Sequence, residues 1–224
     1  MMNDLARMID HTLLRSDATR SQINQLCLEG KKYNFASVCM NPIWVKFCQE
    51  TLLGSGVRIC TVSGFPLGAS NSIIKAKEAE IGINDGADEI DMVMNVGALK
   101  DGDYKLVEDD IQAVRHAVGK DKILKVIIEA GILTNDEKIK AAEIVKSSGA
   151  DFVKTNTGFG YGSATIEDVK LLRRIVGNNM GVKASGGIRD FQTAKGLIAA
   201  GANRIGTSSG VKIVEESRSS GLKG

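Results

Sequence analysis

One junction recurs along this chain and restricts its fold. It occurs as Gly86-Ala87-Asp88, Gly149-Ala150-Asp151 and Gly201-Ala202-Asn203. Each copy places a glycine just after a helix-like segment and a polar residue just before an apolar, strand-like run. This is the helix-to-strand turn of a barrel or of a doubly wound sheet.

Strand-like and helix-like segments alternate along the whole chain. We expect strands at residues 8–12, 36–40, 57–63, 89–94, 123–129, 151–155, 180–184 and 203–206. We expect helices at 19–33, 42–54, 70–85, 103–118, 134–148, 190–200 and 208–216, and a further helix beginning at Ser163 or Thr165. Thr19-x-x-Gln22 and Thr134-x-x-Glu137 have the pattern of capping boxes.

Eight such units in 224 residues predict an α/β fold, a single-domain (β/α)8 TIM barrel over residues 1–224 with a short N-terminal helix. Residues 217–224 read as a mobile tail. A doubly wound sheet is the competing architecture. It would show a glycine-rich fingerprint after its first strand, and the segment at residues 39–42, CMNP, is not one.

Composition narrows the class of protein. The net charge of +2 gives no global field that would favour nucleic acid or a membrane surface. No run of 18 apolar residues and no signal peptide is found. Four cysteines without C-x-x-C spacing indicate a reducing compartment, and hence the cytoplasm. The chain has only two histidines, too few for a histidine-rich metal site, so we expect no metal.

Alternation along the strands predicts which side chains point into the barrel. Apolar residues such as Ile90 and Met92 share one face of their strand and should pack on the helices. The opposite faces carry charged residues: Asp10, Asp91, Lys125, Lys154 and Lys183. Burying five charges is costly unless they pair or take part in chemistry.

Two of these residues suggest amine catalysis. Lys154 and Lys183 lie at corresponding ends of neighbouring strands. A free lysine has a pKa of about 10.4, and burial beside another ammonium group lowers that pKa toward neutrality. Asp91 offers a carboxylate that can relay protons. Together the three residues provide the amine and the proton-transfer groups that Schiff-base chemistry on a carbonyl compound requires.

Two loops near the end of the chain predict a phosphate site. One is Ser185-Gly186-Gly187, and the other is Gly206-Thr207-Ser208-Ser209, which opens a short helix. Backbone N–H groups and helix N-termini bind anions, and barrels commonly hold phosphate after strands seven and eight. Gly158 lets the loop after the sixth strand approach the same anion.

The chain resembles the deoxyribose-phosphate aldolase family over nearly its whole length. The resemblance rests on IDHTLL (9–14), SVCMNP (37–42), DEIDMVMNVG (88–97), LKVIIEAGIL (124–133), KTNTGFG (154–160), KASGGIR (183–189) and GTSSG (206–210). It implies that Lys154 forms the Schiff base, that Lys183 perturbs it and relays protons, and that Asp91 joins the relay. It also implies that Asp10, Thr12 and Thr157 line the sugar site.

Two positions depart from the family pattern. Asn156 stands where the family usually has serine, and the chain ends in GLKG without the C-terminal tyrosine of some members. Two further residues have open roles. Cys39 is either a core or a pocket-lining residue, and we include it among the substrate-binding candidates. Lys125 is either a site residue or the structural partner of Glu129.

The resemblance implies reversible cleavage of 2-deoxy-D-ribose 5-phosphate to acetaldehyde and D-glyceraldehyde 3-phosphate. The iminium is the electron sink, so no cofactor is expected. The expected partner is this phosphosugar, and the protein is expected to form a homodimer or homotetramer. Two alternatives stay open: another phosphosugar barrel enzyme, such as an isomerase or a transaldolase-like enzyme, and a non-catalytic phosphosugar-binding protein.

Overall fold

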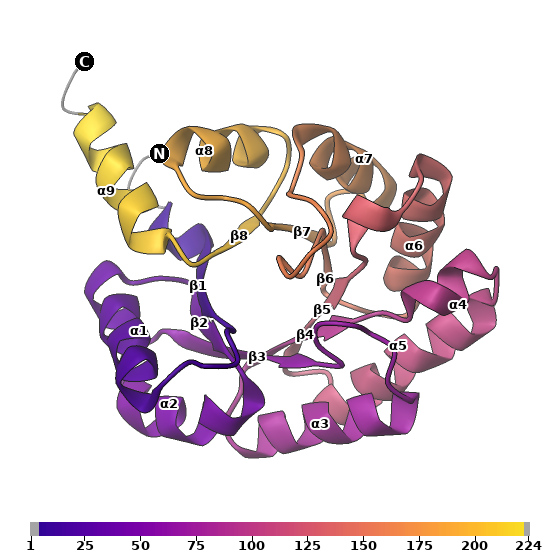
Figure 1. Cartoon of the computed structure of the whole chain (residues 1–224), viewed down its shortest axis with the longest axis horizontal. Helices are drawn as coiled ribbons and strands as arrows, with labels where there is room; N and C mark the ends of the chain where they lie inside the picture. Colours follow the sequence, from indigo (N-terminus) through magenta and orange to yellow (C-terminus); the bar gives the residue numbers. More distant parts are fainter. Residues whose placement is uncertain (1–4, 222–224) are drawn as a thin grey trace.

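Eight parallel strands close into a barrel in sequence order, as the computed structural model of residues 5–221 shows (Figure 1). The strands are β1 (Ile9–Leu13), β2 (Ser37–Met40), β3 (Arg58–Ser63), β4 (Glu89–Val93), β5 (Ile123–Ile127), β6 (Phe152–Lys154), β7 (Gly181–Ser185) and β8 (Arg204–Thr207). Ile9 pairs with Ile205, which joins β1 to β8. The (β/α)8 prediction is confirmed, and the doubly wound sheet is excluded.

Helices surround the barrel (Figure 1). The α-helices are α1 (Arg20–Tyr33), α2 (Val45–Leu52), α3 (Ser72–Asn84), α4 (Val96–Lys100), α5 (Tyr104–Val118), α6 (Asn135–Ser147), α7 (Ile166–Val176), α8 (Phe191–Ala199) and α9 (Gly210–Gly221). Within residues 5–221, the 3-10 helices are η2 (Ala6–Met8), η3 (Pro42–Trp44) and η4 (Ala130–Ile132). In this part of the chain, the expected short N-terminal helix corresponds to the single turn η2.

Local sequence signals set most helix starts. Both capping boxes form, because the side chains of Thr19 and Thr134 accept hydrogen bonds from the backbone N–H groups of Gln22 and Glu137. Thr165 caps α7 in the same way. The start of α3 differs from the prediction, because Asn71 rather than Ser70 caps this helix.

Other helices also differ from the prediction. Residues 42–44 form the 3-10 turn η3, so α2 begins later than predicted. The five-residue helix α4 was not expected, since it is too short to show a periodic pattern. The last helix begins at Gly210 and runs to Gly221, so residues 217–221 are helical rather than a tail. Residues 222–224 lie outside the described part.

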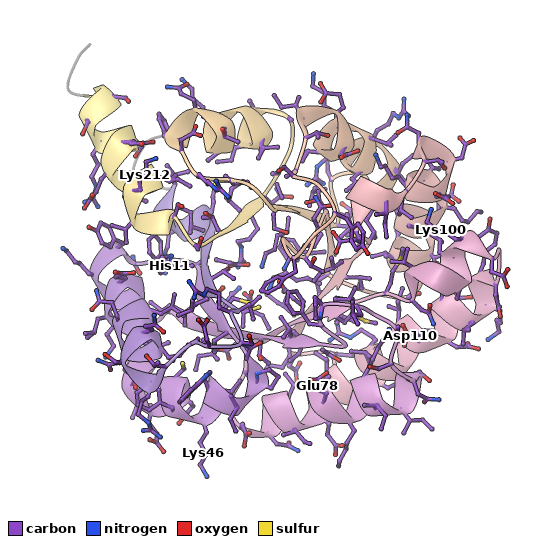
Figure 2. All side chains as sticks on the ribbon, in the orientation of Figure 1. His11, Lys46, Glu78, Lys100, Asp110 and Lys212 are labelled. Carbon is purple, nitrogen blue, oxygen red and sulfur yellow. The ribbon has the colours of Figure 1, made fainter. Side chains whose placement is uncertain are left out.

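The apolar core lies between the barrel and the helices. Ile90, Met92 and Leu124 point outward from the strands and are fully buried in one cluster with the inner faces of the helices. Charged residues cover the opposite, outer faces of the helices, where Lys46 on α2 and Lys100 on α4 project away from the barrel (Figure 2). Within residues 5–221, no helix is long and apolar enough to cross a membrane.

Replacing Leu124 by alanine tests this core. Leu124 has no exposed surface, so Leu124→Ala leaves a cavity and should lower the free energy of unfolding by about 2–5 kcal/mol. Leu53→Ala is the matched control, because Leu53 is 79% exposed and its loss should change that free energy by less than about 0.5 kcal/mol. Urea unfolding measures both, and equal effects would contradict the assignment of Leu124 to the core.

Candidate active site

The five charged residues that alternation predicted to point inward do lie inside the barrel. Asp10 comes from β1, Asp91 from β4, Lys125 from β5, Lys154 from β6 and Lys183 from β7. None of them is more than 3% exposed. Lys154 and Lys183 are register partners on adjacent strands, so their side chains extend side by side into the interior.

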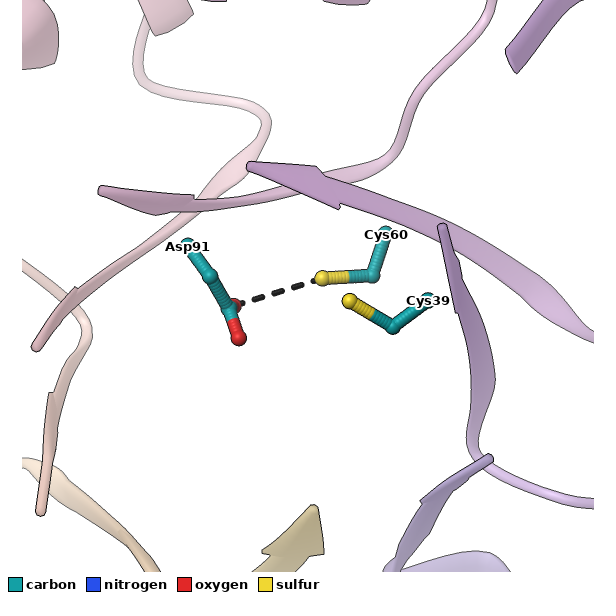
Figure 3. A group of neighbouring side chains, drawn as sticks. All are labelled: Cys39, Cys60 and Asp91. Atoms are coloured by element: carbon teal, nitrogen blue, oxygen red, sulfur yellow. Dashed lines mark hydrogen bonds between the residues drawn. The ribbon is translucent and has the colours of Figure 1, made fainter. Parts of the chain in front are cut away.

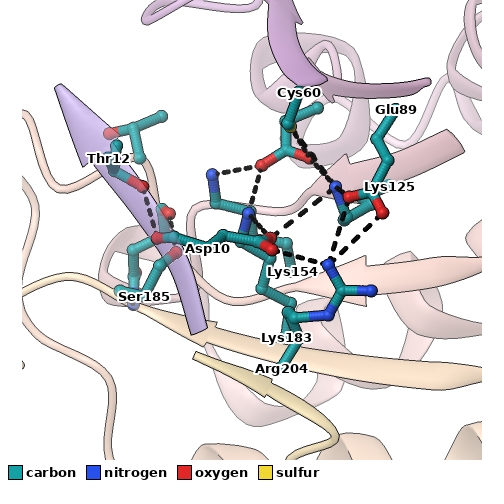
Figure 4. Close-up of polar contacts among 12 residues, drawn as sticks. Asp10, Thr12, Cys60, Glu89, Lys125, Lys154, Lys183, Ser185 and Arg204 are labelled. Atoms are coloured by element: carbon teal, nitrogen blue, oxygen red, sulfur yellow. Dashed lines mark hydrogen bonds and ion pairs between the residues drawn. The ribbon is translucent and has the colours of Figure 1, made fainter. Parts of the chain in front are cut away.

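The Asp91 carboxylate is the centre of this cluster, since it pairs with three lysines. Figure 4 shows these lysines, Lys125, Lys154 and Lys183, with their polar contacts inside the barrel. Its Oδ2 accepts hydrogen bonds from Lys154 Nζ at 2.8 Å and from Lys183 Nζ at 2.7 Å. Its Oδ1 accepts one from Lys125 Nζ at 2.7 Å. Burial alone would raise the pKa of Asp91, but the three ammonium groups hold it well below its usual value. Asp91 is therefore an anion at neutral pH.

A second carboxylate holds Lys183 from the other side. Asp10 Oδ2 lies 2.5 Å from Lys183 Nζ, and Asp10 Oδ1 accepts hydrogen bonds from Arg204 Nη1 at 2.5 Å and Ser37 Oγ at 2.6 Å. Burial acts to raise the pKa of Asp10, but the charges of Lys183 and Arg204 lower it overall. Arg204 was not among the residues that the sequence singled out, since it lies at the start of its strand.

The pKa of Lys183 corrects one expectation. We expected neighbouring lysines to depress the pKa of each other. Burial does act to lower the pKa of Lys183, but the charges of Asp10 and Asp91 outweigh it, and that pKa is raised. The sequence pattern identified the two lysines as neighbours but did not show that a shared carboxylate lies between them. Lys183 is thus a cation in the absence of substrate.

Lys125 forms its ion pairs with other residues than Glu129, the structural partner that the sequence suggested. Its Nζ lies 2.6 Å from Glu89 Oε2 and 2.7 Å from Asp91 Oδ1. Glu129 is not its partner, because β5 ends at Ile127 and the backbone of Glu129 turns left-handed, with φ of 52°. The carboxylate of Glu129 instead accepts a hydrogen bond from the backbone N–H of Thr157 at 3.3 Å. Lys125 belongs to the Asp91 cluster.

A cavity of about 380 Å³ opens at the carboxyl ends of the strands, above this cluster. It is lined by Thr12, Leu13, Leu14, Arg15, Lys154, Thr157, Gly158, Phe159, Ser185, Gly186, Gly187, Ile188, Arg189, Gly206, Thr207 and Ser208. Lys154 lines the cavity, whereas Lys183 and Asp91 lie behind it. Lys154 is therefore the amine of the cluster that a ligand in the cavity can reach.

Most of the predicted anion loop residues line this cavity. Gly158, Ser185, Gly186, Gly187, Gly206 and Ser208 all do so. The backbone of Gly187 has φ of +72°, and a Cβ there would lie 2.2 Å from Ser163 Oγ, so only glycine fits. Ser209 does not line the cavity, and its backbone N–H donates to Thr207 Oγ1 at 2.9 Å.

Other cavity residues were not anticipated from the sequence. Arg15 and Arg189 add two cationic side chains at the rim. Arg189 is the last residue of the KASGGIR motif, so its place in that motif could have identified it as a candidate cavity residue. Asp10, Cys39 and Lys125, which the sequence offered as substrate-binding residues, are fully buried and do not line the cavity.

Asn156, which departs from the usual family residue, links three strand ends. Its side chain is fully buried. Its Oδ1 accepts a hydrogen bond from Gly131 N–H at 3.1 Å, and its Nδ2 donates to the carbonyl of Ser185 at 3.2 Å. The amide thus connects the loop after β6 to the loop after β5 and to the end of β7, and so fixes the segment that carries Lys154.

Cys39, Cys60 and Asp91 place two thiols and a carboxylate oxygen within 4.8 Å of one another (Figure 3). Such a group could hold a metal ion. However, both oxygens of Asp91 already accept hydrogen bonds from lysine ammonium groups. A metal ion here would compete with three cations for one carboxylate, so the donor set does not fit a metal site.

Comparison with known proteins gives a consistent match. The model of the DeoC/LacD family of aldolases matches residues 5–216. A protein of Geobacillus sp. (strain WCH70) named deoxyribose-phosphate aldolase is 58% identical, over 96% of each chain. One of Streptococcus uberis with the same name is 59% identical, over 93% of this chain and 94% of its own.

Solved structures agree with these matches. A putative deoxyribose-phosphate aldolase from Coccidioides immitis has a TM-score of 0.94 and 44% identity, covering 97% of this chain and 87% of its own. Deoxyribose phosphate aldolase from Aeropyrum pernix, described as a unique tetramer, has a TM-score of 0.91 and 33% identity, covering 98% and 93%. Mandelate oxidase, at 12% identity and a TM-score of 0.65, shares the fold alone.

Removing the Lys125 ammonium group tests the cluster. Lys125→Met keeps most of the unbranched side chain but leaves Glu89 and Asp91 without one buried cation, so the free energy of unfolding should fall by about 3–5 kcal/mol. Lys122→Met is the control, because Lys122 pairs with Asp88 near the surface, where an ion pair is worth about 0–1 kcal/mol. Urea unfolding at neutral pH measures both. A Lys125→Met protein as stable as its control would show that the cluster does not need this cation.

Proposed function

The chain belongs to the DeoC/LacD family of aldolases, and from this premise we propose that it cleaves 2-deoxy-D-ribose 5-phosphate reversibly to acetaldehyde and D-glyceraldehyde 3-phosphate through a Schiff base on Lys154. One observation carries the residue assignment. Lys154 is a buried amine that lines the 380 Å³ cavity, with a second lysine and a carboxylate directly behind it.

The ion pairs of the cluster support Lys154 as the nucleophile. The carboxylates of Asp10, Glu89 and Asp91 pair with five cationic groups, which are Arg58, Lys125, Lys154, Lys183 and Arg204. Lys154 contacts one carboxylate, whereas Lys183 and Lys125 each contact at least two, so Lys154 gives up the fewest ion pairs when it bonds to a substrate.

The reaction then follows from the positions of the groups. The Lys154 amine attacks the C1 aldehyde, and loss of water gives the iminium. The 3-hydroxyl gives its proton to water held by Asp91 and Lys183, the C2–C3 bond breaks, and its electron pair moves into the iminium to form an enamine. D-glyceraldehyde 3-phosphate leaves. Lys183, which is a cation, gives its proton to C2 and takes up in its place the proton that water received from the 3-hydroxyl. Water then hydrolyses the new iminium, which releases acetaldehyde and the Lys154 amine.

The remaining cavity residues suit the two ends of the substrate. Thr12 and Thr157 line the same cavity as Lys154 and offer hydroxyl groups to the sugar. Gly158, Ser185, Gly186, Gly187, Gly206 and Ser208 provide the backbone and hydroxyl donors for the phosphate, and α9 begins just beyond them. We assign Asp10 and Lys125 to the ion-pair network that holds Lys183 and Asp91 in place, since they are buried behind the cavity. Cys39 packs beside this network with Leu14, Cys60 and Val62.

The proposal extends to the oligomeric state and the cellular setting of the protein. The Aeropyrum pernix relative is described as tetrameric, and we propose that this chain also forms a homo-oligomer, whose mass light scattering would measure. All four cysteines are buried as free thiols, which fits a cytoplasmic setting.

Reductive trapping tests the Schiff base. Incubation with acetaldehyde and borohydride should add one ethyl group to Lys154, because hydride reduces the iminium to a stable secondary amine. Peptide mass mapping locates the group. Lys154→Leu should lose both the label and all turnover, whereas Lys46→Leu, on the outer face of α2, should lose neither. Labelling at Lys183 with Lys154 unmodified would overturn the assignment. An isomerase or a non-catalytic binding protein would give no adduct.

Replacing Lys183 separates the two lysines. Lys183→Met removes the group that returns the proton to C2, so kcat should fall by roughly 10²- to 10⁴-fold. Trapping of acetaldehyde on Lys154 should still occur. Steady-state kinetics measure the first effect and mass mapping the second. Unchanged turnover would remove Lys183 from the relay.

A further inference from the structure

A second cavity lies at the opposite end of the barrel from the catalytic cavity. Its volume is about 210 Å³, and it is lined by Arg7, Ala36, Gly56, Arg58 and Arg204. Arg7 lies in η2 before β1, Arg58 is the first residue of β3, and Arg204 is the first residue of β8. The cavity therefore opens at the amino ends of the strands, and three of its five lining residues are arginines.

Arg204 presents unused donors to this cavity. It is 7% exposed, and its hydrogen bonds to Asp10 and Glu89 all come from Nη1. In Figure 4 the other terminal nitrogen of Arg204 carries no dashed line. Among the described residues, neither Nε nor Nη2 of Arg204 has a hydrogen-bond partner. A buried guanidinium group thus lines the cavity with two nitrogens that have no partner in residues 5–221.

Arg58 has a similar arrangement. Its Nη1 donates to Glu89 Oε1 at 3.2 Å, and its side chain is otherwise half exposed. Arg58 and Arg204 therefore bind the same carboxylate from one side and leave their remaining donors free on the other. Glu89 is also bound by Lys125 at 2.6 Å, so its charge is already shared among three cations.

The positive charge and the size of the cavity suit an anionic ligand. None of the five lining residues is acidic, and three carry a positive charge. Guanidinium groups donate paired N–H bonds that match the oxygens of phosphate, and such charge-assisted bonds are stronger than neutral ones. Gly56 has no side chain to obstruct the ligand. The cavity is large enough for a phosphate group with a short attached chain.

We infer that this cavity is a second anion site, which binds a phosphate group through Arg7, Arg58 and Arg204. The group belongs either to inorganic phosphate or to a small phosphate monoester. This site is separate from the substrate phosphate loops and does not depend on the aldolase mechanism. Its occupant would lie next to Arg204, whose partner Asp10 also holds Lys183.

Titration calorimetry with inorganic phosphate tests the site, once the catalytic cavity has been closed to anions. Ser208→Glu places a carboxylate in that cavity and should remove phosphate binding there. The Ser208→Glu protein should still bind one phosphate per chain. Adding Arg7→Gln and Arg58→Gln, both at exposed positions, should weaken this binding at least tenfold. Adding Arg174→Gln, on the exposed face of α7, is the matched control and should leave it unchanged.

Three further measurements complete the test. Crystals of the Ser208→Glu protein soaked in tungstate should show an anomalous peak between Arg58 and Arg204. The affinity of the Ser208→Glu protein for glycerol 3-phosphate is compared with its affinity for inorganic phosphate. A higher affinity for glycerol 3-phosphate identifies a monoester site, and equal affinities identify a site that recognises the phosphate group alone. Acetate should bind at least tenfold more weakly. The inference is overturned if the Ser208→Glu protein binds no phosphate, if the two arginine replacements leave its affinity unchanged, or if acetate binds equally well.

Discussion

A single carboxylate, that of Asp91, holds three lysine ammonium groups inside the barrel. Each charge would be costly to bury alone, and each is stabilised because strands around the barrel bring its partners into the interior. The interior of this barrel is therefore an ion-pair network, whereas the conventional apolar core lies outside the strands. The network stays in place only while β1, β4, β5, β6 and β7 keep their relative positions, so the fold and the chemistry depend on the same contacts.

The loops at the catalytic end are held as firmly as the strands. Glu129 adopts a left-handed backbone conformation and accepts a hydrogen bond from Thr157 N–H, while Asn156 connects Gly131 to Ser185. These contacts cross from β5 to β7 on both sides of Lys154. A non-glycine residue with positive φ persists only where its surroundings compensate for the strain. Here the strain lies beside the proposed nucleophile, where a fixed geometry is of most use.

The fold was predictable because strand alternation, capping boxes and glycine junctions are local signals. The inward direction of Lys154, Lys183 and Asp91 followed from alternation alone. Other features were not predictable, since they depend on contacts between distant segments. Arg204 reaches Asp10 across 194 positions of sequence, and the raised pKa of Lys183 results from two carboxylates on other strands. The left-handed turn at Glu129 also gave no signal, because glutamate rarely adopts it.

Lys154 lies in register with Ile127 on one side and Lys183 on the other. Successive side chains of a strand point to opposite faces, so a shift of one residue in β6 would turn Val153 into the interior and Lys154 into the apolar layer beneath the helices. An insertion or deletion within this three-residue strand would thus remove the nucleophile and bury a charge in one step. Insertions and deletions in this region are therefore compatible with the site only in the loops that flank β6, and the length of β6 itself must stay fixed.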